Sequence, residues 1–222
     1  MGYLNRIIPL RFITRHYSGS ASVLFSNLYF YTGWDEEKQE KFAESFLIFD
    51  NFITEQEEQN FMSEIEPHLK RQIYEKDHWD DAIQGFRETE RKNFNKNNSV
   101  VIDRLKSTSF PTSGKESQIL PYTHVLDLAD FGFIKPHIDS SRFCGSTVAV
   151  LSLLSPCVAR FRLDTDRDLM VDAFIDRRSL YVMKGFSRYK CTHEILKQED
   201  SIFNNKVINK SRRVSIICRN EA

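Results

Sequence analysis

Long apolar runs, paired cysteines and a net charge are all absent from this 222-residue sequence. No stretch approaches the roughly 18 consecutive apolar residues that a membrane-spanning helix needs. The four cysteines show no C-x-x-C spacing, which excludes a zinc knuckle and a thioredoxin-like motif and favours buried free thiols. The chain is long enough for a hydrophobic core of its own. We therefore expect one globular domain without a membrane span.

Acidic residues are missing from the first 34 positions, where arginines alternate with serines and apolar residues. This composition is typical of a mitochondrial transit peptide, although an ordinary disordered tail also fits it. We expect residues 1–34 to be a presequence and disordered start, cleaved near Tyr17 or Ser18, and residues 45–222 to form the single folded domain. The predicted location is the mitochondrial matrix. The three arginines concerned are Arg6, Arg11 and Arg15.

Charge disfavours nucleic acid as a partner without excluding it. The chain holds 31 basic and 31 acidic residues, and removal of the three arginines leaves 31 − 3 = 28 basic residues and a net charge of −3. A mildly acidic body is poorly suited to a phosphate backbone. The sequence holds no signal for an oligomer, and we expect a monomer.

Helical patterns lie mainly in the first half of the folded part. The run SFLIFDNF (45–52) predicts a strand, and Thr54 with Glu57 has capping-box spacing, which predicts a helix from about Glu55. A second, shorter helical pattern passes through residues 101–105. Between these patterns the chain is charged and aromatic without a clean period, and we interpret RETERK (87–92) as a solvated helix face.

From Tyr122 onward the sequence consists of short runs of β-branched and aromatic residues separated by turn residues. Such closely spaced strands predict a sandwich, barrel or jelly roll. The expected fold class is α+β, mainly β, with supporting N-terminal helices.

His137 and Asp139 are two residues apart in a predicted strand, so both side chains project to the same face. An imidazole and a carboxylate placed in this way could chelate a metal, and His193 is the one histidine in the later strands. A facial Fe(II) site needs two histidines, one carboxylate and open positions. The alternative is a hydrogen-bonded surface pair without metal.

The last strand, RRVSIICR (212–219), places Arg213 and Arg219 on one face, whereas Val214, Ile216 and Cys218 occupy the other. Planar guanidinium groups form bidentate pairs with carboxylates, so two inward arginines indicate a dicarboxylate ligand. An edge strand with its arginines in water is the alternative.

The order H-x-D, then His193, then R-x₅-R resembles the Fe(II)/2-oxoglutarate-dependent dioxygenases of the AlkB family. Strings such as GFIKPHIDSSRFCG, LSLLSP and SLYVMKG resemble the family's mitochondrial AlkB homologue 7 branch, in register over about residues 45–220. The resemblance implies a double-stranded β-helix, or jelly roll, with O2 and 2-oxoglutarate as cosubstrates. It further implies Fe(II) ligands His137, Asp139 and His193, and 2-oxoglutarate contacts from Tyr181, Arg213 and Arg219.

Two departures bear on the substrate. Repair members of the family carry N-x-Y on the strand before H-x-D, where this chain has Leu126-Asp127-Leu128, and they carry an asparagine where Ser215 stands. We therefore expect hydroxylation of a protein or small molecule rather than nucleobase demethylation. The resemblance further implies links to programmed necrosis after alkylation damage and to fatty-acid metabolism. Demethylation of mitochondrial RNA and a non-enzymatic regulator on the same scaffold stay open as alternatives.

The remaining histidines and aromatic residues have plainer interpretations. We expect His124 to be a satisfied core histidine, and His68 and His78 carry no metal spacing. Trp79 and Phe86 are expected to pack on the sheet, with the substrate mouth as the alternative.

Overall fold

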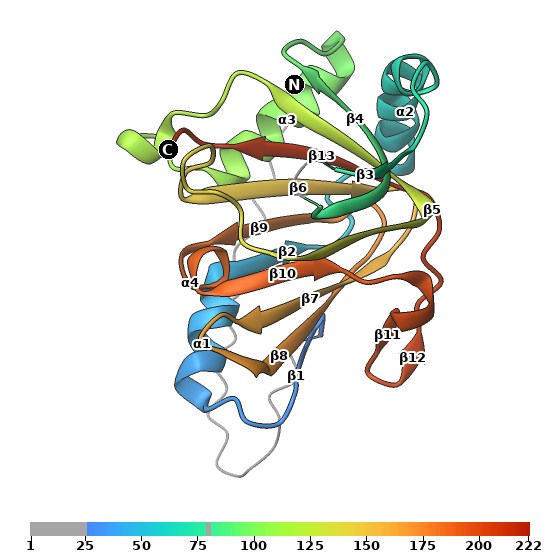
Figure 1. Ribbon diagram of the computed structural model, residues 1–222. Helices are drawn as coiled ribbons and strands as arrows, with labels where there is room; N and C mark the ends of the chain where they lie inside the picture. The colour runs from blue at the N-terminus through green and yellow to red at the C-terminus, as the bar shows by residue number, and fades with distance from the viewer. Residues whose placement is uncertain (1–25, 79–80) are drawn as a thin grey trace, which may run out of the picture.

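The computed structural model describes residues 26–78 and 81–222, in which eleven strands form one antiparallel sheet and two more form a small hairpin (Figure 1). Within these residues, no helix is long and apolar enough to cross a membrane. The strands are β1 (Leu28–Phe30), β2 (Phe46–Phe49), β3 (Glu75–Asp77), β4 (Ile83–Arg91), β5 (Thr123–His137), β6 (Thr147–Leu153), β7 (Cys157–Leu163), β8 (Asp166–Ile175), β9 (Leu180–Lys184), β10 (Cys191–Ile195), β11 (Ile202–Phe203), β12 (Lys206–Val207) and β13 (Arg213–Arg219). The helices are α1 (Glu36–Ser45), α2 (Glu55–Leu69), α3 (Lys96–Ser109) and α4 (Gly185–Tyr189), with 3-10 turns at Lys115–Ser117 and Gln198–Asp200.

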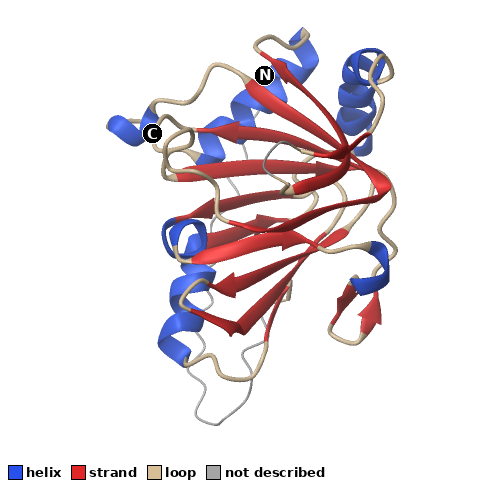
Figure 2. Cartoon of the chain, in the orientation of Figure 1, coloured by secondary structure: helices blue, strands red, loops and turns tan. Residues whose placement is uncertain are grey.

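The sheet curls on itself, and the long strand β5 belongs to both of its halves. The strand order is β1-β8-β7-β10-β5-β13-β6-β9-β2, with β4 also paired to β5. Residues 124–128 of β5 pair with β13, whereas Ile134 and His137 pair with β10. Figure 2 shows the strands gathered in the middle and the longer helices at the periphery. The expected fold class, mainly β with supporting helices, is confirmed.

Helices α2 and α3 cover the outer face of one half of the sheet. The capping box at the start of α2 is present, because Thr54 Oγ1 accepts from the Glu57 amide and the Glu57 carboxylate accepts from the Thr54 amide. Val214, Ile216 and Cys218 of β13 are buried in the cluster between these helices and the sheet. The predicted alternation of β13 is therefore confirmed, and its arginine face turns the other way.

The folded part begins earlier than residue 45. Strand β1 pairs with β8, with Leu28 opposite Ala173, and α1 follows directly. The rings of Phe30, Trp34 and Phe42 are buried and meet edge to face. Burial of these aromatic rings stabilises the segment. A strand of three residues leaves little periodic pattern in the sequence, so the sequence did not indicate this element. The rest of the predicted presequence, residues 1–25, lies outside the described residues.

The charged run RETERK does not form a solvated helix face, because residues 83–91 form strand β4, and that prediction was wrong. Its side chains alternate between two environments: Arg87 pairs with buried Asp127 on one face, and Glu88 meets His124 on the other. Arg87 and Glu88 each have a charged or polar partner on a neighbouring strand, which the local polarity of the sequence does not reveal.

All four cysteines are free and buried, as expected. Burial raises the pKa of each thiol, and that of Cys191 to about 12. These thiols are therefore protonated and unreactive in the native protein.

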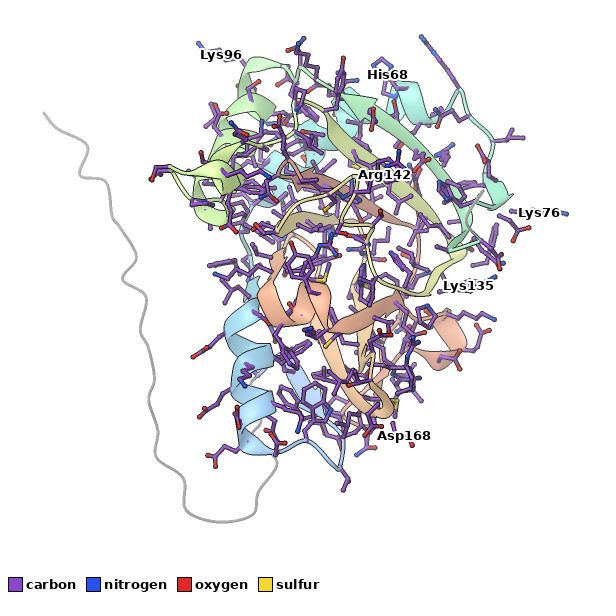
Figure 3. All side chains as sticks on the ribbon, turned by 60° about the vertical axis from the view of Figure 1, so that its left-hand side comes forward. His68, Lys76, Lys96, Lys135, Arg142 and Asp168 are labelled. Atoms are coloured by element: carbon purple, nitrogen blue, oxygen red, sulfur yellow. The ribbon has the colours of Figure 1, made fainter. Side chains whose placement is uncertain are left out.

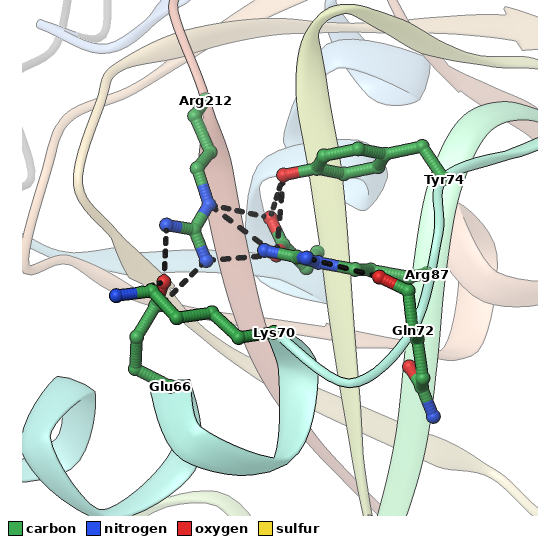
Figure 4. Close-up of polar contacts among 7 residues, drawn as sticks. Glu66, Lys70, Gln72, Tyr74, Arg87 and Arg212 are labelled. Atoms are coloured by element: carbon green, nitrogen blue, oxygen red, sulfur yellow. Dashed lines mark hydrogen bonds and ion pairs between the residues drawn. The ribbon is translucent and has the colours of Figure 1, made fainter.

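A polar network centred on Asp127 stabilises the outer face of β5 (Figure 4). The fully buried Asp127 carboxylate accepts from Arg87 Nε at 2.7 Å and from Arg212 Nη2 at 2.8 Å. The Tyr74 hydroxyl lies 3.3 Å away, and Glu66 of α2 accepts from Arg212 at 2.6 Å. This network connects α2, the β3–β4 hairpin and the start of β13.

Candidate functional site

A cavity of about 400 Å³ lies between the two halves of the curled sheet. Side chains from both halves of β5 and from β4, β6, β7, β9, β10 and β13 line it. Most of its wall is apolar, and its polar groups gather at particular places, as is usual for ligand sites.

His137, Asp139 and His193 meet at one side of this cavity. His137 is the last residue of β5 and lies directly opposite His193 in the β5–β10 ladder, so the two imidazole centroids are 4.3 Å apart. Asp139 Oδ1 lies 3.4 Å from His137 Nε2 and 4.0 Å from His193 Nε2. One ligand atom from each residue lies within 4.8 Å of the others. The structure therefore brings together the three residues that the sequence indicated as metal ligands.

The protonation states of this group suit a divalent cation. Burial alone would raise the pKa of Asp139, but the neighbouring His137, His193 and Arg219 keep it well below its usual range. Burial and then His137 lower the pKa of His193 to about 3. One carboxylate and two imidazole nitrogens are the donor set of a facial-triad metal site.

The orientation of His137 is set by a backbone contact. Its Nδ1 lies 2.9 Å from the Lys135 carbonyl oxygen, which can only accept, so Nδ1 carries the proton and Nε2 keeps its lone pair. Asp139 is held through its own backbone, because the buried Arg188 guanidinium donates to the Asp139 carbonyl at 2.7 Å. Arg188 lies on α4, five residues before His193, and no spacing rule indicated it.

Arg213 lies in the cavity wall with its guanidinium fully buried. Its Nε donates to Ser152 Oγ at 3.1 Å and its Nη1 to Ser215 Oγ at 2.6 Å. Its Nη2 is buried with no hydrogen-bond partner among the described residues. A buried cation with an unpaired donor is costly unless an anion completes it. The group fits a carboxylate ligand.

Tyr181 and Arg219 also line the cavity. Burial raises the pKa of the Tyr181 hydroxyl, against the opposing effect of Arg213 nearby. The Arg219 guanidinium lies within 3.4 Å of His124 Nδ1. All six residues that the sequence analysis proposed for the site therefore line one cavity, and the edge-strand alternative for β13 does not apply.

Two histidines that were not expected to belong to the site, His78 and His124, also line the cavity. His124 is hydrogen-bonded to Glu88 as a satisfied histidine, but it faces the cavity rather than the closed core. His78 lies 3.7 Å from the other oxygen of Glu88. Phe86 is buried in the core as expected, whereas Trp79 lies outside the described residues. His68 is exposed at the end of α2, at the edge of the molecule in Figure 3.

No family model matches the chain. The curated protein "Alpha-ketoglutarate-dependent dioxygenase alkB homolog 7, mitochondrial" from Mus musculus is 38% identical over 196 residues, 88% of this chain and 87% of that protein. The protein of the same name from Bos taurus is 43% identical over 168 residues, 76% of this chain and 75% of that protein. Among solved structures, OsALKBH1 has a TM-score of 0.57 at 11% identity and covers 79% of this chain and 98% of its own, which shows a shared fold.

Proposed function

The chain belongs to the alkB homolog 7 family of alpha-ketoglutarate-dependent dioxygenases, and from this premise we propose that it is a mitochondrial enzyme that hydroxylates a protein or small molecule. Alpha-ketoglutarate is 2-oxoglutarate. The observation that carries the proposal is the convergence of two histidines and a carboxylate beside a cavity that also holds a buried arginine with an unpaired donor.

His137, Asp139 and His193 are the proposed ligands of Fe(II). Iron with bound 2-oxoglutarate supplies the activation of O2 that oxidises a C–H bond of the substrate. The chain's own part is to bring these three donor groups together in the wall of the cavity, where they would hold the ion. Lys135 and Arg188 hold His137 and Asp139 in that arrangement through backbone carbonyls.

Arg213 is the proposed partner of the distal carboxylate of 2-oxoglutarate, with Tyr181 beside it. Its two serine contacts fix the plane of the guanidinium, and Nη2 is left to donate to the carboxylate. Arg219, six residues further along the same face of β13, is proposed to meet the iron-chelating end. Both charges of the diacid are then compensated.

The cavity wall supports a protein or small-molecule substrate rather than a nucleic acid. Ile83, Leu126 and Ile134 give it apolar surface, and Glu88 places a carboxylate at the side formed by β4. Hydrogen bonding from His124 outweighs burial and lowers the pKa of Glu88, so this group is an anion. An anion in the cavity wall repels a phosphate backbone.

Arg213→Met is expected to weaken 2-oxoglutarate binding by at least about 100-fold, because a charge-assisted contact of a buried guanidinium is lost. The measurement is succinate release from the Fe(II)-reconstituted protein over a range of 2-oxoglutarate concentrations. Arg71→Met, at an exposed position, is the control and should match the wild type. A wild-type protein that neither binds nor consumes 2-oxoglutarate would refute the proposed function.

The proposed compartment is the mitochondrial matrix, supported by the arginine-rich, acid-free segment 1–34 and by relatives that are named mitochondrial. Deletion of residues 1–17 is expected to abolish import into isolated mitochondria, because the three arginines of the segment are lost. The imported full chain should carry a new N-terminus near Tyr17 or Ser18. Recovery of an intact Met1 inside mitochondria would argue against cleavage.

A further inference from the structure

Glu88, His124 and Arg219 form a continuous polar chain across three neighbouring strands. Strand β5 lies between β4 and β13, with Leu126 opposite Glu88 and Ile217 opposite His124. All three polar side chains line the cavity. We call this set the Glu88–His124–Arg219 relay.

The contacts of the relay fix the tautomer of His124. Arg219 Nη1 lies 3.4 Å from His124 Nδ1, and a guanidinium can only donate, so Nδ1 is the acceptor. The ring proton is then on Nε2, which lies 2.8 Å from Glu88 Oε2. The hydrogen bonds run in one direction, from Arg219 through His124 to the carboxylate.

The two arginines of β13 are held in different ways. Arg213 is fully buried and fixed by two serine hydroxyls, whereas Arg219 is only partly buried. Among the described residues, the Arg219 side chain makes one hydrogen bond, to His124. A long, partly exposed side chain loses rotamer freedom when it binds a ligand. A hydrogen bond that already holds the side chain in place reduces this loss of conformational entropy on binding.

We propose that Glu88 and His124 are positioning residues that hold Arg219 in place for the iron-chelating carboxylate end of 2-oxoglutarate. This inference rests on the proposed function of the cavity. It assigns to the β4 strand a part in cosubstrate binding, although neither Glu88 nor His124 needs to touch the cosubstrate.

The test measures the dissociation constant of 2-oxoglutarate for the full chain loaded with Mn(II), which replaces Fe(II) without turnover. His124→Phe keeps a ring of similar size but removes both nitrogens, and we expect binding about tenfold weaker. His124→Asn keeps an acceptor near the place of Nδ1 and should recover most of this loss. Glu88→Gln should give a smaller loss, about threefold, because the contact to His124 loses its charge.

Glu90→Gln is the matched control. Glu90 is exposed on the same strand, two residues from Glu88, and is paired with His124 in register, so both glutamates lie on one face. It should bind 2-oxoglutarate as the wild type does. The affinity for Mn(II), measured by electron paramagnetic resonance, should stay constant in all of these variants, which separates positioning of Arg219 from general damage to the fold.

The relay is refuted if His124→Phe binds 2-oxoglutarate as tightly as the wild type, if Mn(II) affinity falls in parallel, or if Glu90→Gln equals Glu88→Gln. Absence of 2-oxoglutarate binding by the Mn(II)-loaded wild type is a separate result. It would overturn the proposed function itself and the relay with it.

Discussion

Replacement of Asp139 by alanine is expected to lower the affinity for Mn(II) by at least about 100-fold and to reduce succinate release to that of a protein-free control. Asp139 Oδ1 is the atom that both histidines share, at 3.4 and 4.0 Å from their Nε2 atoms. It is also the one anionic donor of the three. Two neutral imidazoles alone hold a divalent cation poorly. Electron paramagnetic resonance measures the Mn(II) bound, and chromatography of the reaction measures succinate.

Asp103→Ala is the control for this change, because Asp103 is exposed on α3 and should bind metal as the wild type does. Full succinate release by the Asp139 variant would contradict the proposed ligand set. The same variant distinguishes the enzymatic role from the alternative, in which the protein is a non-enzymatic regulator with the same fold. If cells respond to the variant as they do to the wild-type protein, the cellular effect does not need catalysis.

Asp127→Asn is expected to lower the free energy of unfolding by about 3 kcal/mol, because it leaves two arginines without their buried counter-ion. Arg87 is 10% exposed and keeps little access to water, whereas Arg212, at 31%, can rehydrate in part and retains Glu66. We therefore expect the lower end of the range measured for broken buried ion pairs. For a chain of this size the melting temperature should fall by about 10 °C.

Asp130→Asn makes the same chemical change three residues along β5, where the side chain is exposed and accepts from the Phe131 amide next to it. Its melting temperature should change by little more than the error of the measurement. Chemical denaturation monitored by tryptophan fluorescence gives the free energies. Equal effects of the two substitutions would show that the buried network in Figure 4 contributes no special stability.

Local spacing was enough to find two pairs of site residues. His137 and Asp139 are two residues apart, and Arg213 and Arg219 share a face of β13 whose other face is apolar. Strand periodicity explains the second pair, whereas Asp139 lies two residues beyond the end of β5. The identity of the third group, His193, followed from the scarcity of histidines in the later strands, and its position opposite His137 is a matter of register that the structure supplies.

Tertiary partners explain what the sequence did not show. Glu88 carries no sign in its own neighbourhood that it faces a cavity, because its partner His124 lies 36 residues away. Arg188 acts on the Asp139 carbonyl from 49 residues away. The runs YTHVLDL and IKPHID suggest two separate strands because Asp130 and Gly132 stand between them, yet β5 is continuous from Thr123 to His137. Pairing with β4 on both sides of this stretch keeps it extended.

Strand β5 pairs with β13 near its start and with β10 near its end. The number of residues between these two ladders therefore matters as much as the identity of the proposed metal ligands. Leu128 is paired with Arg213, and His137, nine residues later, is paired with His193. Regular alternation would place residues an odd number apart on opposite faces, yet Leu126 and His137 both line the cavity, because β5 shifts register against β4 and β10 between them. An insertion or deletion in this stretch is therefore expected to turn the His137 imidazole away from the cavity unless a further bulge compensates for it.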